Sequence, residues 1–287
     1  MNFSGKNINL EIPRVMGILN VTPDSFSDGG EILLHSGKPL IDKALKRAEL
    51  MHRSGATFID IGGESTRPGA TEISLEEEMG RVLPLVEKIK NNIDVIVSID
   101  TSSPEIMLEG ARVGAGLIND VRALQRPGAI EAVSATQLPV CLMHMQGKPG
   151  TMQVAPNYAS LIKEVLIFLE ERISACAKAG IDRDKIIIDP GFGFGKTLEH
   201  NIELLGRLTA LKKLKLPLLI GLSRKGMLGL ITGKSTEKRL AAGLSASVIG
   251  LMQGVNIVRT HDVAEMIDAI KVYLAIKNNE LKLDLST

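Results

Sequence analysis

Polar side chains follow the ends of several short apolar runs along the chain. These positions are Asn20, Asp100, Asn119, Asp120, His144, Asp189, Ser223, Arg259 and His261. Taken singly, an Asp or Asn at such a place commonly caps a helix or closes a turn, and we interpret Asp120 in this way. Taken together, these carboxylates, amides and cations could bind one polar ligand if the fold brings the ends of the runs to one edge.

Three basic side chains are suited to binding an anion. Arg259 and His261 are two positions apart at the end of one run, so in a strand their side chains point the same way. Arg67 lies in a loop after an earlier run, where an isolated arginine is more commonly just solvated. Arginine and histidine at one site suit a phosphate or pyrophosphate, because both donate hydrogen bonds to its oxygens.

Two glycine-rich stretches resemble nucleotide-binding loops but have the wrong spacing. The stretch at 190–197 ends in Gly-Lys-Thr, but Pro190 stands where a phosphate-binding loop needs its first glycine. Lys196 also replaces the third glycine of a dinucleotide fingerprint. The stretch at 228–235 fails in the same way, with Leu228 at the required glycine. Neither loop is therefore expected to bind a nucleotide.

Eight units, each an apolar run followed by a helical pattern, must position the polar set. Runs rich in Val, Ile and Leu predict strands buried on both faces of a parallel sheet. The expected strands are 15–20, 58–62, 96–100, 117–120, 140–143, 186–189, 218–222 and 257–260. The expected helices are 41–54, 75–90, 104–113, 128–136, 158–179, 199–213, 237–253 and 263–277.

Eight such repeats favour a closed (β/α)8 barrel, the TIM barrel of the α/β class, over two open sheets. Because no linker and no change of composition interrupts them, we expect a single domain over residues 1–287. The segments after the strands are long and rich in Gly, Pro and polar residues, as at 21–40 and 144–157. Barrel enzymes carry their active sites on these loops, so the polar set should converge at one mouth.

Composition argues against several other classes of protein. The 287 residues contain 34 Lys and Arg against 33 Asp and Glu, a formal net charge of +1 that predicts neither nucleic-acid nor membrane partners. No apolar run approaches the roughly 20 residues of a membrane-spanning helix. Cys141 and Cys176 lack metal or redox spacing and are expected as buried free thiols. Residues 1–13 show no secretory signal pattern, so we expect a cytoplasmic protein.

Eight ordered motifs, each at the end of an expected strand, resemble those of the dihydropteroate synthase family. They are MGILNVTPDSFSDGG at 16–30, DIGGESTRPG at 60–69, SIDT at 98–101, IND at 118–120, MHM at 143–145, DPGFGFGK at 189–196, SRK at 223–225 and RTHD at 259–262. The resemblance implies joining of p-aminobenzoate to 6-hydroxymethyl-7,8-dihydropterin diphosphate, with release of pyrophosphate. It also implies a Mg²⁺ cofactor, inhibition by sulfonamides and a homodimer formed through barrel helices.

The resemblance assigns roles to individual residues. The pterin would be bound by Asp100, Asn119, Met143, Asp189, Gly221 and Lys225. The diphosphate would be bound by Asn20, Arg67, Arg259 and His261, with Mg²⁺ on Asn20. The p-aminobenzoate would be bound by Phe26, Thr66, Pro68, Phe194 and Ser223. In a largely dissociative reaction, Asp100, Lys225, Arg259 and His261 would be the catalytic residues, stabilising the pterin cation and the leaving diphosphate.

Two other functions fit parts of the pattern. A pterin-binding barrel of the methyltetrahydrofolate methyltransferase type would share the pterin contacts, but it needs neither a diphosphate clamp nor an aryl pocket. Arg67, Arg259 and the loop that carries Phe26 argue against it. A non-catalytic pterin-binding paralogue would keep the barrel, and a turnover assay would distinguish it from an enzyme.

Overall fold

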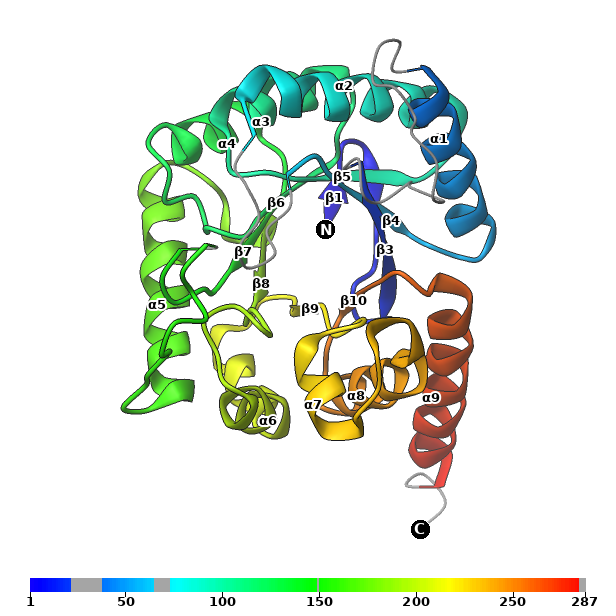
Figure 1. Ribbon diagram of the computed structural model, residues 1–287, viewed down its shortest axis with the longest axis vertical. Coiled ribbons are helices and arrows are strands. Elements are labelled where there is room, and N and C mark those ends of the chain that lie inside the picture. Colours follow the sequence, from blue (N-terminus) through cyan, green and yellow to red (C-terminus); the bar gives the residue numbers. More distant parts are fainter. Residues whose placement is uncertain (22–37, 65–72, 149, 284–287) are drawn as a thin grey trace.

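The computed structural model of this chain describes residues 1–21, 38–64, 73–148 and 150–283. Eight parallel strands form one sheet in the order β8-β7-β6-β5-β4-β3-β10-β9, and a parallel bridge between Ile188 and Leu218 joins β8 to β9 (Figure 1). The strands are β3 (Arg14–Asn20), β4 (Phe58–Gly62), β5 (Ile96–Asp100), β6 (Leu117–Asp120), β7 (Val140–Met143), β8 (Ile186–Asp189), β9 (Leu219–Ile220) and β10 (Ile257–Thr260). The predicted (β/α)8 barrel is confirmed.

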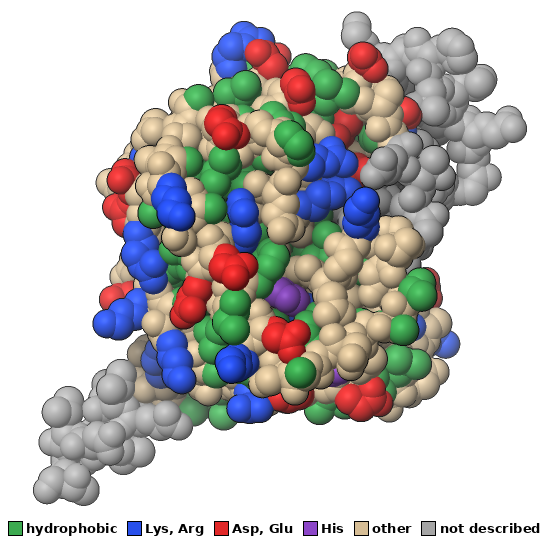
Figure 2. Space-filling model, turned by 90° about the vertical axis from the view of Figure 1, so that its left-hand side faces the viewer, with side chains coloured by type: hydrophobic (Ala, Val, Ile, Leu, Met, Phe, Trp, Pro, Cys, Tyr) green, Lys and Arg blue, Asp and Glu red, His purple; other side chains and the backbone are tan. Residues whose placement is uncertain are grey.

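Helices surround the barrel on the outside (Figure 1). They are α1 (Lys38–Arg53), α2 (Leu75–Asn92), α3 (Pro104–Val113), α4 (Ala129–Thr136), α5 (Leu161–Lys178), α6 (Leu198–Gly206), α7 (Gly226–Thr232), α8 (Leu240–Met252) and α9 (Val263–Leu283). In the described ranges, none is both long and apolar enough to cross a membrane. Acidic and basic side chains are interspersed on the face shown in Figure 2.

The alternation of side chains along each strand divides the barrel into an apolar floor and a polar mouth. Each strand contributes one buried apolar side chain to the floor: Met16, Phe58, Ile96, Leu117, Cys141, Ile187, Leu219 and Ile257. The next side chain toward the mouth on the same face lies two residues further along. At this level β4, β5, β6, β8 and β10 carry Asp60, Ser98, Asn119, Asp189 and Arg259.

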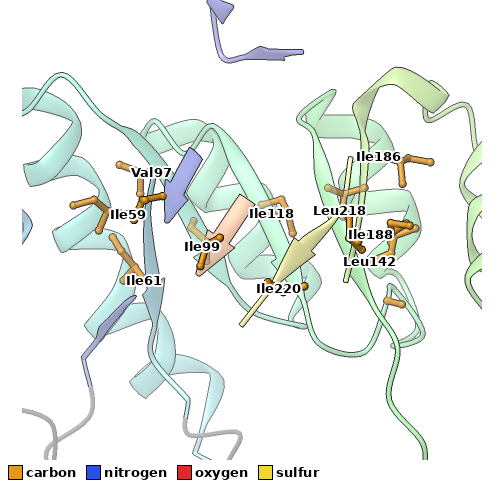
Figure 3. Close-up of a cluster of buried hydrophobic side chains, with 14 of the residues drawn as sticks. Ile59, Ile61, Val97, Ile99, Ile118, Leu142, Ile186, Ile188, Leu218 and Ile220 are labelled. Atoms are coloured by element: carbon orange, nitrogen blue, oxygen red, sulfur yellow. The ribbon is translucent and has the colours of Figure 1, made fainter. Parts of the chain in front are cut away.

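Except for Asp120 and Thr260 at the strand ends, the outward-facing side chains of the strands are apolar and pack against the helices. Figure 3 shows Ile59 and Ile61 of β4 beside Val97 and Ile99 of β5 in this layer, and all four are buried. Full burial of such a side chain stabilises the fold by about 1.5–3 kcal/mol. The helices therefore fix the strands from outside, which leaves the inward positions free to carry polar groups.

An N-terminal hairpin closes the floor of the barrel, and the sequence pattern did not predict it. Strands β1 (Asn2–Phe3) and β2 (Lys6–Asn7) pair antiparallel, and Figure 1 shows the N-terminus inside the ring of strands. The Phe3 ring meets the Phe58 ring edge-on, with 4.9 Å between centroids. Two-residue strands are too short to produce a periodic signal, so only the packing reveals them.

Several predicted boundaries were wrong in the last third of the chain. The helix expected at 199–213 is two elements, because α6 ends at Gly206 and a 3-10 helix follows at Leu208–Leu214. The strand expected at 218–222 is reduced to β9, and the segment after it, expected as loop, contains α7. The helix expected at 237–253 begins only at Leu240, after a 3-10 turn at Thr236–Lys238. Periodicity locates such elements but does not separate α from 3-10 turns.

Candidate active site

Four neighbouring strands bring polar residues into one row at the mouth. In the register of the sheet, Asn20 pairs with Gly62, Gly62 with Asp100, and Asp100 with Asn119. A Cβ on Gly62 would lie 3.3 Å from Oδ1 of Asn20 and 3.9 Å from Oδ2 of Asp100. The missing side chain therefore leaves an open space that an amide oxygen and a carboxylate oxygen both face.

Asp60 is the centre of a buried network that links four strands. Its Oδ2 accepts from Nε of Arg259 at 2.6 Å and from Nδ2 of Asn119 at 3.0 Å, and its Oδ1 accepts from Oγ of Ser98 at 2.6 Å. Nη2 of Arg259 donates to Oδ2 of Asp100 at 2.8 Å. A buried carboxylate is tolerated only where cations and donors surround it, and here one arginine serves two carboxylates.

This network sets the charge state of the mouth. Burial raises the pKa of Asp100, while the neighbouring Arg259 cation opposes the increase and Asp60 adds to it. Burial disfavours the Arg259 cation, but Asp60 and Asp100 outweigh that cost and raise the pKa of Arg259 above its ordinary value. Arg259 is therefore a permanent cation between two acidic groups.

Asp189 and Lys225 lie across the barrel from this row. One oxygen of Asp189 accepts from the backbone N–H of Gly191 at 2.7 Å, and its strand neighbour in register is Met143. Burial raises the pKa of Asp189 to about 6, against the Gly191 hydrogen bond and the Lys225 cation. Burial lowers the pKa of Lys225 to about 8, against the attraction of Asp189. The pair can present an acceptor and a donor to the same ligand.

The glycine-rich loop after β8 packs backbone against backbone. Gly191 and Gly195 both have positive φ, at +71° and +61°. A Cβ at Gly191 would lie 1.9 Å from the carbonyl oxygen of His144, and one at Gly195 would lie 2.4 Å from that of Gln146. These glycines thus allow close packing rather than phosphate binding. The half-buried Phe194 ring stands between them, 4.3 Å from Nζ of Lys225.

Ser223 and His261 are in contact, although sequence reasoning gave them different substrates. Oγ of Ser223 lies 2.9 Å from Nδ1 of His261. Burial, together with the smaller effects of the Arg224 and Arg259 cations, lowers the pKa of His261 to about 3, so the imidazole is neutral at pH 7. It can bind an anion as a neutral hydrogen-bond donor rather than as the cation that the sequence suggested. Gly221, the remaining predicted residue on this side, lies against the Arg259 side chain.

Some of the predicted residues lie outside the described residues, and others have structural roles. Phe26, Thr66, Arg67 and Pro68 belong to the first group. Asp120 points away from the mouth, where its carboxylate accepts from the backbone N–H of Arg122 at 2.9 Å and of Leu124 at 2.7 Å, as predicted for a turn. Cys141 and Cys176 are buried free thiols, as predicted.

Sequence reasoning missed three residues of the site, namely Asp60, Ser98 and Lys196. It considered only the ends of the strands, whereas Asp60 and Ser98 lie two residues earlier. A signal was present, because Asp60 interrupts an apolar strand and shares a face with Gly62. Lys196 was set aside along with the nucleotide-loop motif. The residue lies beneath the glycine loop and is only 3% exposed.

The arrangement offers two kinds of binding surface. Buried Asp189 and Asn119, with Lys225, suit the donor and acceptor edge of a flat polar ring deep in the barrel. Arg259, His261 and Asn20 are more exposed and suit an anionic group with an associated cation. In the described part of the chain no cluster of three or more His, Cys, Asp or Glu side chains forms a metal cage. A metal here would need most of its ligands from water or substrate.

Comparison with known proteins identifies close relatives. The profile of the pterin-binding enzyme family matches residues 16–261. Dihydropteroate synthase of Escherichia coli K12 is 52% identical over 279 residues, which cover 96% of this chain and 97% of that protein. The Yersinia pestis dihydropteroate synthase in complex with a sulfonamide drug superposes with a TM-score of 0.91 at 48% identity, over 97% of this chain and 99% of that one. The Xanthomonas albilineans enzyme with 4-aminobenzoic acid gives a TM-score of 0.89 at 44% identity, over 96% of this chain and 98% of that one.

We predict that Asp60→Ala lowers the free energy of unfolding by about 3–5 kcal/mol, because the buried groups that donate to Asp60 would lose their acceptor. Equilibrium urea denaturation measures the difference. The control is Glu109→Ala, which breaks an exposed ion pair with Arg112 and should cost less than about 1 kcal/mol. An equal decrease in the free energy of unfolding in the two variants would show that the Asp60 network contributes no more to stability than an exposed ion pair.

Proposed function

The chain belongs to the dihydropteroate synthase family of pterin-binding enzymes, and we infer that it joins 6-hydroxymethyl-7,8-dihydropterin diphosphate to p-aminobenzoate. The aryl amine forms a bond to the pterin methylene carbon, the carbon–oxygen bond to the diphosphate breaks, and pyrophosphate and 7,8-dihydropteroate are released. The observation that carries this proposal is the convergence of Asp100, Asn119, Asp189, Lys225 and Arg259 in one barrel mouth.

Recognition of the pterin is assigned to polar residues inside the barrel. Asp189 would accept from the amino and ring N–H groups of the pterin, while Asn119 and Lys225 bind its other edges. Met143 and Gly221 would line the same pocket, one buried beside Asp189 and the other against Arg259. A ligand without these hydrogen-bonding groups would leave buried polar side chains unpaired, so the site should reject it strongly.

The cleavage step requires stabilisation of charge at both ends of the breaking bond. Positive charge develops on the pterin, near the proposed position of Asp100, and negative charge develops on the departing diphosphate. Arg259, His261 and Arg67 would bind the diphosphate oxygens. Arg259 also pairs with Asp60 and Asp100, which hold its guanidinium group in place. Its position is therefore fixed before substrate arrives, which avoids reorganisation during the reaction.

A Mg²⁺ ion fits the chemistry of the residues near Asn20. The Asn20 side chain offers one neutral oxygen beside the open space over Gly62, and Asp100 faces the same space. Mg²⁺ commonly keeps several waters and takes other ligands from substrate phosphates, so one amide suffices to locate it. When bound, the ion would neutralise diphosphate oxygens as the carbon–oxygen bond breaks.

The p-aminobenzoate would lie further out, against Phe194 and Ser223. The resemblance adds Phe26, Thr66 and Pro68 to this compartment. A sulfonamide presents a similar flat aryl amine and would compete for the same surface. The alternatives of a methyltransferase and of a non-catalytic paralogue have less support, because the curated relatives at 40–52% identity are dihydropteroate synthases.

A homodimer is also proposed, on the evidence of the surface formed by α6, α7 and α8. Helix α8 contains no charged residue, yet Ile249 and Met252 are 46% and 73% exposed. Leu230 and Ile231 of neighbouring α7 are 72% and 54% exposed, and Figure 1 shows the three helices side by side. A helix that is apolar on all sides is normally covered, and a second copy of this surface would cover it symmetrically.

A cytoplasmic location is proposed as well. Both cysteines are buried free thiols, which suits a reducing compartment. The substrates are small polar molecules, and the polar mouth gives them access from water.

We predict that purified protein forms dihydropteroate and pyrophosphate in equal amounts, and only when Mg²⁺ is present. Excess chelator should abolish turnover, and Asn20→Ala should raise the Mg²⁺ concentration needed for half-maximal rate by about tenfold. Pyrophosphate release, measured with and without p-aminobenzoate, reports the chemistry. The exposed Asn92→Ala on α2 serves as control and should keep the wild-type Mg²⁺ dependence. Full activity in excess chelator would refute the metal assignment.

We predict a bell-shaped pH profile of kcat/KM for the pterin diphosphate. Below about pH 6 protonation removes the Asp189 carboxylate, and above about pH 8 Lys225 loses its ammonium, because burial moves the two pKa values toward neutrality. Asp189→Asn should lose the part of the acidic limb that belongs to Asp189, since an amide does not titrate, and keep the part due to Asp100, whose pKa burial raises to about 7. Asp189→Ala should weaken pterin binding by about 1–3 kcal/mol or more, as measured by calorimetry.

The exposed Asp182→Ala is the control for both measurements. Unchanged pterin affinity in a folded Asp189→Ala protein would place the pterin pocket elsewhere in the barrel. An acidic limb that is unchanged in Asp189→Asn would show that Asp189 does not contribute to that titration.

We predict that wild-type protein has the mass of two chains in light scattering coupled to size exclusion. Ile249→Glu should shift it to one chain, because it buries a charge at the centre of the proposed interface. Leu50→Glu introduces the same charge at a 63% exposed leucine on α1 and should leave the mass unchanged. A monomeric wild type, or a dimeric Ile249→Glu protein, would contradict this interface.

A further inference from the structure

Lys196 is a buried lysine beneath the glycine loop after β8, and burial lowers its pKa to about 7. Nζ of Lys196 donates to the carbonyl oxygen of Gly191 at 2.9 Å and to that of Phe194 at 3.1 Å. It also lies 2.9 Å from Nδ1 of buried His144. No role in substrate binding has been given to Lys196 or His144, although burying a lysine this deeply is costly.

The imidazole of His144 is suited to accept a hydrogen bond from Lys196. Burial, together with the smaller effect of the Lys196 charge, lowers the pKa of His144 to about 2, so His144 is neutral at pH 7. The neutral ring can accept at Nδ1 when its proton is on Nε2. Lys196 therefore has three hydrogen-bond acceptors, two of them from the same loop. These acceptors explain why the protein can bury this lysine.

Within the loop, the backbone N–H of Phe194 also donates to the carbonyl oxygen of Gly191, at 3.2 Å. Gly191, Gly193 and Gly195 all have positive φ, and glycines restrict the backbone weakly. From outside, Tyr158 donates its hydroxyl to the carbonyl oxygen of Gly195 at 2.7 Å, and Asn201 accepts from Gly193 N–H at 2.8 Å. Lys196 alone among these side chains contacts the backbone of Phe194.

The position of the Phe194 ring matters for both substrate compartments. Its ring lies 4.3 Å from Nζ of Lys225, which belongs to the proposed pterin pocket. The same ring is a proposed wall of the p-aminobenzoate compartment. A shift of its backbone would move this wall, while Asp189 and Asn119 would stay on their strands.

We propose that Lys196 is a positioning residue, which ties Gly191 to Phe194 from inside the loop and so holds the Phe194 ring at the border of the two compartments. The proposal deepens the proposed function, because it rests on the p-aminobenzoate compartment. Lys196 does not touch substrate, and its effect on p-aminobenzoate passes through Phe194.

A double-mutant cycle with Lys196→Met and Phe194→Leu tests this proposal. Methionine keeps the length of the side chain and removes the donors, so Lys196→Met should raise the KM for p-aminobenzoate by about tenfold. The Kd for pterin diphosphate, measured by calorimetry, should change by less than about threefold. In the Phe194→Leu background, Lys196→Met should raise that KM by less than about twofold, because the ring it positions is already gone.

A structural role without positioning predicts different results. General loosening of the fold would give effects that multiply in the double variant, or would weaken both substrates equally, and either result would overturn the proposal. Lys196→Arg keeps the charge and donors and should give an intermediate KM. If Lys196→Met does not fold, Lys196→Arg takes its place in the cycle and is judged by the same two outcomes.

Arg172→Met provides a matched control. Arg172 is also a basic side chain that donates to two backbone carbonyls of one loop, those of Ala123 at 2.7 Å and Leu124 at 3.1 Å. Its loss should lower stability and leave the KM for p-aminobenzoate unchanged. The single variant Phe194→Leu tests the p-aminobenzoate compartment separately from the role of Lys196. An unchanged KM for p-aminobenzoate in this variant would refute the compartment itself. If Phe194→Leu raises this KM and the effects of the two substitutions multiply in the double variant, only the role of Lys196 is refuted.

Discussion

The interaction on which the site depends is the pairing of Arg259 with Asp60 and Asp100 inside the barrel. Three charges from β4, β5 and β10 are buried together, and each would be strongly unfavourable alone. Ser98 and Asn119 satisfy the remaining oxygens of Asp60. The network joins the strands into one rigid wall and fixes the side chains that we assign to the pterin and the diphosphate.

Such a network is possible because the barrel separates its two hydrophobic regions from the mouth. The outward faces of the strands pack against the helices, and eight apolar side chains with Phe3 fill the floor. Polar residues can then occupy the upper interior without weakening either core. Catalytic residues placed on strands in this way lose little entropy on binding substrate, which favours electrostatic stabilisation of a charged transition state.

The loop after β8 is held in place by hydrogen bonds to its backbone and not by the pairing of strands. Its glycines allow it to pack against the segment after β7, but they give it no stiffness, so its shape depends on Lys196 within the loop and on side chains from other segments. Lys196, Tyr158 and Asn201 supply the hydrogen bonds. Asp189 and Asn119, which we assign to the pterin, are thus on strands, whereas Phe194, which we assign to p-aminobenzoate, is on a tied loop. This arrangement would suit a rigid pocket for one substrate beside an adjustable one for the other.

The sequence by itself determined the eight strands, their order and the polar residues at their ends, because alternation, length and strand-end chemistry are local properties. It did not reveal which of these side chains meet. Arg259 and Asp60 are 199 positions apart, and their pairing follows only from the closure of the barrel. The hairpin at the floor, the break after Gly206 and the burial of Lys196 were likewise decided by packing. Local patterns specify which face a residue occupies, whereas partners across the interior depend on how the whole sheet curves and closes.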